Sequence, residues 1–188
     1  MGEGCCARVP LGVTGGVTGG ATEGVTGCAI VRGFVLAGGR SSRFGSDKAV
    51  ADWQGVPAAL ALVRVLEEAG LQAAVVARQT RVELSGTVEV IERASESFNP
   101  LLGVAAIAGE DAVFLCPCDA EHLTASMVRA LCAAEAVSAD SPLVGVWPAR
   151  LRQQAAAAAA AGSSVRALAA ELPRLDVGAT GNRNAPGA

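Results

Sequence analysis

From residue 30 onward, two kinds of apolar stretch alternate along the chain. Short, continuous apolar runs are typical of buried strands, whereas stretches in which apolar residues recur every three or four positions are typical of helices. Alternation of the two patterns is characteristic of a mostly parallel sheet that carries helices on both faces. The sequence therefore predicts a doubly wound α/β domain over residues 30–188.

The individual elements follow from the same pattern. Strands are expected over residues 30–37, 73–77, 87–91, 112–116, 143–147 and 174–177. Helices are expected over residues 57–69, 101–108, 124–137, 149–161 and 164–172. Pro57 favours the first position of a helix, Thr124 can cap one, and Gly162 stands where one should end.

Residues 1–29 differ from the rest of the chain. A four-residue repeat, Val-Thr-Gly-Gly in its first copy, fills residues 13–28. Glycine at every fourth position weakens both helices and strands, and the period is far shorter than that of a solenoid. We expect residues 1–29 to be a flexible extension that activity does not need. The sequence leaves open whether this extension belongs to the natural protein.

Composition narrows the classes of function. Apolar residues make up 51% of the chain but aromatic residues only 3%, so small aliphatic side chains must fill the core. The net charge is −3 and lysine and arginine form no stripe, which disfavours nucleic acid as a partner. No apolar run approaches the roughly 20 residues that span a bilayer. Without a signal-peptide pattern, the expected compartment is the cytoplasm.

Cysteine pairs raise the question of a zinc site. The chain has six cysteines, among them Cys116 and Cys118, but a single histidine. A closed zinc site needs four ligands, usually supplied as two closely spaced pairs, and a second pair at that spacing is missing. Buried, reduced cysteines are therefore the favoured interpretation.

A glycine-rich, cationic segment directly follows the first expected strand. It reads Leu36-Ala-Gly-Gly-Arg-Ser-Ser-Arg-Phe-Gly-Ser-Asp-Lys48. Gly38 and Gly39 allow successive backbone N–H groups to face an anion, and Arg43 and Lys48 add two positive charges. The spacing matches neither the Walker A motif nor Gly-x-Gly-x-x-Gly. The segment predicts a phosphate-binding loop at the carboxyl edge of the sheet.

A carboxylate follows the central apolar run of residues 112–116. A strand interior does not keep an unpaired charge, so Asp119 should project beyond the sheet edge, near the phosphate loop. Mg²⁺ prefers one or two carboxylates together with waters and phosphate oxygens. Asp119 is thus the candidate Mg²⁺ ligand, the alternative being a cap for the helix that begins near Thr124. His122 is interpreted as a surface or loop-packing residue rather than a general base.

The loop from Leu36 to Lys48 resembles the signature of the molybdenum cofactor guanylyltransferases (MobA-like), which have a Rossmann-like nucleotidyltransferase fold. The resemblance extends over roughly residues 31–186 and includes Pro-Cys-Asp119. It implies catalytic roles for Arg43, Lys48 and Asp119, and a metal-binding role for Asp119. It implies nucleotide contacts from Leu36, Ala37, Gly38, Gly39, Lys48, Glu92, Gly103 and Asp119. It places Asn182 and Asn184 on the acceptor side.

Several segments depart from the family pattern. Asn99 stands in place of the first glycine of Gly-Pro-Leu-x-Gly, and Ser141 where a histidine often precedes Pro-Leu. Arg93 occupies the position of an aspartate that contacts the nucleotide, so Glu92 is the nearest carboxylate for that role. Glu121 and His122 replace the usual proline and aromatic residue.

The resemblance implies transfer of GMP from GTP to molybdopterin with release of pyrophosphate and Mg²⁺ as cofactor. It also suggests contact with proteins that mature molybdoenzymes. Two alternatives remain open: a nucleotidyltransferase that uses CTP or a sugar phosphate, and a non-catalytic nucleotide-binding module. A screen of four nucleotides separates the first alternative from a GTP enzyme, and pyrophosphate release excludes the second.

Overall fold

The computed structural model describes residues 30, 32–37, 48–53, 55–78, 82–84, 88–91 and 99–181. The extension predicted over residues 1–29 lies outside these ranges, so its proposed flexibility stays a prediction. Within the described ranges, no helix combines the length and apolar character needed to cross a membrane.

A seven-stranded sheet forms the centre of the described part of the chain, in the order β5-β4-β1-β6-β8-β7-β9. The strands are β1 (Arg32–Leu36), β4 (Gln72–Ala77), β5 (Val88–Ile91), β6 (Val113–Pro117), β7 (Val137–Ser138), β8 (Gly145–Trp147) and β9 (Arg174–Leu175). β1 pairs in parallel with β4 and β6, and β4 with β5. β8 runs antiparallel to both β6 and β7, while β7 and β9 are parallel. The predicted mostly parallel α/β sheet is confirmed.

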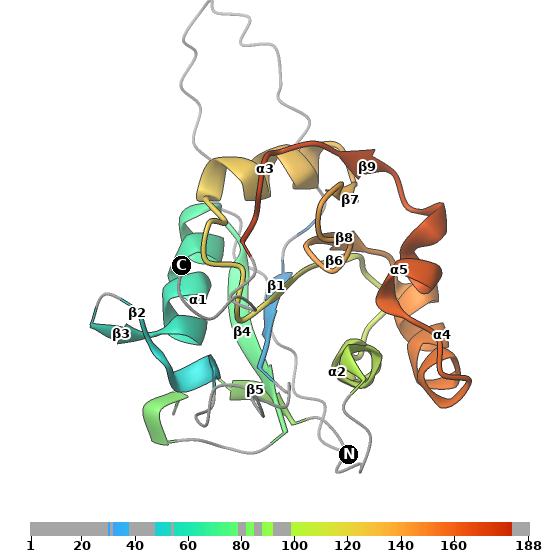
Figure 1. The fold of residues 1–188 in the computed structure, drawn as a ribbon, viewed down its shortest axis with the longest axis horizontal. Helices are drawn as coiled ribbons and strands as arrows, with labels where there is room; N and C mark the ends of the chain where they lie inside the picture. The colour runs from blue at the N-terminus through green and yellow to red at the C-terminus, as the bar shows by residue number, and fades with distance from the viewer. Residues whose placement is uncertain are drawn as a thin grey trace, which may run out of the picture.

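Helices cover both faces of this sheet (Figure 1). α1 (Ala58–Glu68) and α3 (Ala125–Ala133) share one buried cluster with the sheet. α2 (Pro100–Ala106), α4 (Ala149–Ala160) and α5 (Val165–Leu168) share a second cluster with it. The remaining elements are short: η1 (Lys48–Val50), η2 (Val82–Leu84), η3 (Ala169–Glu171) and a hairpin of β2 (Asp52–Trp53) and β3 (Val56–Pro57).

The strands supply both clusters because successive residues face opposite sides of a sheet. In β6, Phe114 belongs to the cluster with α1 and α3, and Leu115 to the cluster with α2 and α4. Small residues bring the layers close together, as the scarcity of aromatic residues predicts. A Cβ atom on Gly33 of β1 would lie 3.1 Å from methyl carbons of both Leu66 and Leu71.

Two predicted helices end earlier than expected. The helix predicted over residues 124–137 ends at Ala133, and Val137–Ser138 forms β7. The chain turns at Glu135, whose φ is +47°, and Val137 then becomes fully buried in the sheet opposite Gly145. Sheet pairing and burial thus override the helical pattern. The helix predicted over residues 164–172 divides into α5 and the 3₁₀ turn Ala169–Glu171.

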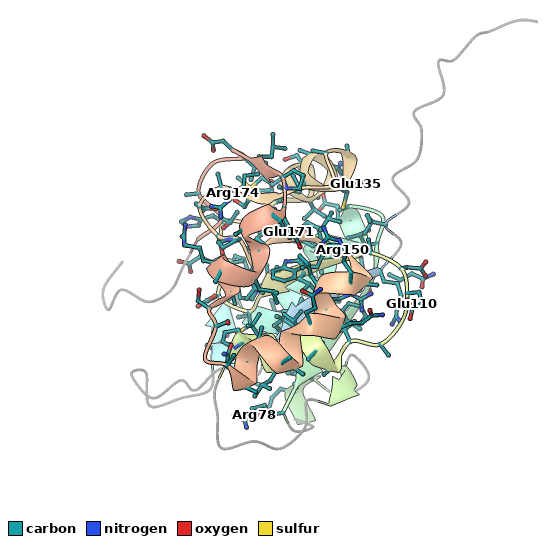
Figure 2. All side chains as sticks on the ribbon, turned by 90° about the vertical axis from the view of Figure 1, so that its right-hand side faces the viewer. Arg78, Glu110, Glu135, Arg150, Glu171 and Arg174 are labelled. Atoms are coloured by element: carbon teal, nitrogen blue, oxygen red, sulfur yellow. The ribbon has the colours of Figure 1, made fainter. Side chains whose placement is uncertain are left out.

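Arg152 is a buried charge in α4, with only 2% of its surface exposed. Its guanidinium donates to the backbone carbonyls of Ile107 (2.7 Å), Gly109 (3.2 Å) and Asp111. Burial lowers its pKa, although the nearby Glu110 and Asp111 oppose that effect. Arg152 therefore fixes the connection between α2 and β6. At the surface of the same layer, Arg150 forms an ion pair with Glu171 (Figure 2).

Candidate functional site

The carboxyl ends of β1 and β6 lie side by side. Leu36 is the register partner of Pro117, and the Cys118 backbone N–H donates to the Leu36 carbonyl at 3.1 Å. On the other side of β1, the Ala37 N–H donates to the Val76 carbonyl at 2.7 Å. The predicted phosphate loop therefore leaves the sheet from Leu36 and Ala37, directly beside the segment that carries Asp119.

Asp119 follows β6 at this edge and is half-buried. A tight turn ends the strand, with the Ala120 N–H donating to the Pro117 carbonyl at 3.2 Å. The alternative role of Asp119 as a helix cap is not observed, because Thr124 caps α3 itself. Its hydroxyl oxygen accepts from the Met127 N–H at 3.4 Å.

A cleft of about 590 Å³ opens at this edge of the sheet. Its lining includes Pro100, Pro117, Asp119, His122, Asp140 and Gly181. Its volume lies within the roughly 300–1,000 Å³ that small-molecule sites usually have. The cleft extends from the end of β6 toward the loop between β7 and β8, the side of β6 that lies away from β4 and β5.

Asp140 lies on the far side of this cleft and accepts several hydrogen bonds. The backbone N–H of Thr180 donates to its Oδ2 at 2.9 Å, and the Thr180 hydroxyl to the same oxygen at 3.2 Å. The Ser138 hydroxyl also donates to Asp140. Partial burial raises the pKa of the Asp140 carboxyl. Hydrogen bonds from Ser138, Thr180 and the Ser141 backbone together lower the pKa by more, so it falls below its usual value.

The segment before Asn182 packs tightly against the loop after Asp119. The His122 N–H donates to the Thr180 carbonyl at 3.1 Å. Gly181 has a φ of +91°, and a Cβ atom there would lie 2.9 Å from the backbone nitrogens of both Glu121 and His122. Only glycine combines this φ with such a close approach at no steric cost. Asp119, Asp140 and Gly181 thus line one cleft from three separate parts of the chain.

Cys116 and Cys118 lie at the end of β6 and in the turn after it, just before Asp119. Cys116 is buried, and burial raises the pKa of its thiol far above the usual range, with Cys118 and Asp119 adding to the effect. Among the residues that the structure describes, no group of three or more His, Cys, Asp or Glu side chains could hold a metal ion by itself. A metal at Asp119 would need ligands from outside this residue set.

The structure locates only part of the predicted site. Leu36 and Asp119 lie together at the sheet edge, as expected. Gly103 is buried within α2, one turn beyond Pro100, and does not line the cleft. Other predicted residues lie outside the described part of the chain: Gly38, Gly39, Arg43, Glu92, Asn182 and Asn184, with Arg93 and the side chain of Lys48. The roles of all these residues stay predictions.

His122 and Asp140 also belong to the cleft. The His122 side chain is 64% exposed and lies 4.0 Å from a Glu121 carboxylate oxygen, while its backbone holds Thr180. Asp140 was missed by sequence reasoning. It follows the two-residue strand β7, which is parallel to β6 because both are antiparallel to β8. A polar residue that follows a strand at the carboxyl edge of the sheet could have indicated Asp140. However, the helix predicted over residues 124–137 overlapped β7, so that strand was not recognised.

Comparisons with known proteins identify the family of the chain. The MobA-like NTP transferase domain model matches residues 33–184. A molybdenum cofactor guanylyltransferase of Xanthomonas euvesicatoria pv. vesicatoria is 36% identical over 105 residues, which are 54% of this chain and 53% of that protein. A probable molybdenum cofactor guanylyltransferase of Opitutus terrae is 42% identical over 77 residues, 39% of this chain and 37% of that protein. The chain thus matches about half the length, or less, of these curated relatives.

Solved structures share the fold. Rv0371c of Mycobacterium tuberculosis superposes with a TM-score of 0.58 at 19% identity, over 79% of this chain and 88% of that one. The Aq1419 protein of Aquifex aeolicus gives a TM-score of 0.57 at 21% identity, over 79% and 86% of the two chains. At this level of identity the likeness concerns the fold alone. The family match over residues 33–184 is more specific, and the chain belongs to the MobA-like NTP transferase family.

Proposed function

We propose that this protein is a guanylyltransferase that transfers GMP from GTP to molybdopterin and releases pyrophosphate. Two curated relatives carry the name molybdenum cofactor guanylyltransferase, which supports this substrate pair. The family match supports nucleotidyl transfer as the reaction class.

One structural observation carries the proposal. The hydrogen bond from the Cys118 N–H to the Leu36 carbonyl, at 3.1 Å, joins the start of the glycine-rich loop to the segment of Asp119. A polyphosphate bound by backbone N–H groups of that loop would therefore extend past a carboxylate at the mouth of the cleft. In open α/β sheets, ligands bind at this edge, beyond the carboxyl ends of the strands.

The proposed reaction requires little from acid–base groups. An oxygen of the acceptor phosphate attacks the α-phosphorus of GTP, a new P–O bond forms, and the bond to the β-phosphate oxygen breaks to release pyrophosphate. The acceptor phosphate is already anionic at neutral pH, so no general base is required. The barrier arises mainly from charge repulsion and from alignment of the two phosphates. Arg43 and Lys48 are the candidates for neutralising the leaving pyrophosphate.

Asp119 fits a Mg²⁺ ion that is shared with substrate. The described residues place two carboxylates at the cleft, those of Asp119 and Asp140, but no group of three or more side chains that could hold a cation. Mg²⁺ keeps several waters and often binds through one or two carboxylates and substrate phosphates, so this donor set suits it. When bound, the ion would neutralise charge on the phosphate oxygens.

The direct test is a screen of GTP, CTP, ATP and UTP with molybdopterin and Mg²⁺, in which pyrophosphate release is measured. We expect release with GTP and formation of a guanylylated acceptor, which mass spectrometry would identify. A preference for CTP would replace the proposal with a cytidylyltransferase. Binding of GTP without pyrophosphate release would favour the non-catalytic alternative.

A further inference from the structure

Three segments that are distant in sequence meet at Thr180, which donates to Asp140 and accepts from His122. Asp140 stands in the loop between β7 and β8, and its partner Thr180 is 40 residues further along the chain. Thr180 in turn accepts from the backbone of His122, three residues after Asp119. A continuous path of hydrogen bonds therefore runs from Asp140 through Thr180 to the loop that carries Asp119.

The groups along this path are well ordered by their surroundings. Thr180 and Ser138, which both donate to Asp140, have no exposed surface. Gly181 lies so close to the backbone of Glu121 and His122 that even a Cβ atom would clash. The segment therefore has no room to shift toward the loop, and the hydrogen bonds to Asp140 keep it from shifting away.

We propose that Asp140 is a positioning residue, which holds Thr180 and thereby fixes the loop that carries Asp119 at the cleft. Its carboxylate provides acceptors only, and every group described around it is a donor: the hydroxyls of Ser138 and Thr180 and the N–H groups of Thr180 and Ser141. An ionised carboxylate can accept hydrogen bonds from all of these donors. The effect on turnover rests on the proposed guanylyltransferase function.

The position of Asp140 predicts which kinetic constant will change. Asp140 lies on the side of β6 that faces β8 and β7, whereas the glycine-rich loop leaves from β1 on the other side. Loss of Asp140 should therefore disturb the alignment of Asp119 and the acceptor more than the initial binding of GTP. A displacement of about 1 Å at a reacting group can reduce turnover as much as a hundredfold.

The test compares Asp140→Ala, Asp140→Asn and Thr180→Val with a matched control, Asp176→Ala. Like Asp140, Asp176 is an exposed aspartate. It accepts from the Gly178 N–H at 2.9 Å, in the same C-terminal segment as Thr180. Asp140→Asn keeps an acceptor for the Thr180 N–H, and its amide can donate to hydroxyls that rotate to accept. It should therefore rescue most of the function lost in Asp140→Ala.

Native-state hydrogen exchange gives a readout that does not depend on the reaction. In Asp140→Ala we expect the His122 amide to lose protection by about tenfold or more. The Leu71 amide, which donates to Leu66 at 3.0 Å far from the cleft, should change much less, whereas global destabilisation would lower both. Asp140→Asn should stay within about threefold of the wild type, and Thr180→Val should be intermediate.

The kinetic readout is turnover with GTP and molybdopterin. We expect kcat to fall about tenfold in Asp140→Ala while KM for GTP stays within about twofold, and Asp176→Ala to match the wild type. If Asp140→Ala does not fold, Thr180→Val decides the question on the same amide, and unchanged protection of His122 in that variant would overturn the proposal. Unchanged protection of His122 in Asp140→Ala, or equal effects of Asp140→Ala and Asp176→Ala, would overturn the positioning role. If the wild type itself has no transferase activity, the proposed function fails, and amide exchange still decides the role of Asp140.

Discussion

The two sides of the cleft reach their positions by different means. On one side, β1 and β6 are adjacent parallel strands, and their ends are fixed by the sheet itself through backbone pairing. On the other side, β7 pairs with β9 through the backbone, but beyond these short strands the side chain of Asp140 joins the β7–β8 loop to Thr180. The first side should therefore tolerate substitution of its side chains without loss of structure, whereas the second depends on individual residues.

The largest effect is expected at Asp119, on the side fixed by the backbone. Asp119→Ala should remain folded, because the strand ends are held by main-chain hydrogen bonds. Turnover should fall by about a hundredfold or more, since a metal ligand contributes several kcal/mol to transition-state stabilisation. Steady-state pyrophosphate release at saturating Mg²⁺ and thermal unfolding would measure the two quantities. A fall of less than about threefold would contradict Asp119 as the ligand.

The next effect, on stability, is expected where β8 meets β7. Gly145 has a φ of +139°, and a Cβ atom there would lie 2.4 Å from the Ala136 carbonyl oxygen and 2.5 Å from the Cα atom of Val137. Gly145→Ala should therefore lower the free energy of unfolding by about 3 kcal/mol, as measured by urea denaturation. Gly109→Ala is the matched control, because Gly109 has a φ of +107° but no atom within 4 Å of its Cβ position.

The control substitution should lower the free energy of unfolding by about 1 kcal/mol, from backbone strain alone. Equal losses in the two glycine variants would show that the close approach of β7 and β8 does not matter for stability. Such a result would contradict the claim that the second side of the cleft depends on individual residues.

The smallest effect concerns acid. Hydrogen bonds lower the pKa of Asp140 in the folded state, so its stabilising contribution is complete above the pKa of the unfolded chain. The contribution is lost as the pH falls through the folded-state pKa, below about pH 4. The difference in Tm between the wild type and Asp140→Asn should therefore be larger at pH 7 than at pH 3. A difference that stays constant over this range would contradict an ionised Asp140 in the folded protein.

The sequence was most informative where a local pattern determines the structure. The apolar run that became β6 was recognisable, and the rule that parallel strands end at one edge then located Asp119 beside Leu36. Thr124 likewise fulfilled its expected role as a helix cap. These features depend on neighbouring residues or on a general property of parallel sheets.

Features that depend on distant partners were not predictable. Val137 follows a helical pattern, and only its pairing with Gly145 and Arg174 makes it part of a strand. Arg152, on an alanine-rich helix, would be expected at the surface, but its carbonyl partners lie more than 40 residues earlier in the sequence. The pairing of Asp140 with Thr180 also spans 40 residues, and nothing local to either residue indicates it.

A crystal structure with a non-hydrolysable GTP analogue and Mg²⁺ tests the central claim most directly. The account predicts that the triphosphate lies against the loop that begins at Leu36 and Ala37, with Mg²⁺ bound jointly by its phosphate oxygens and the carboxylate of Asp119. A triphosphate bound elsewhere, or a Mg²⁺ ion on the triphosphate without Asp119 among its ligands, would contradict it.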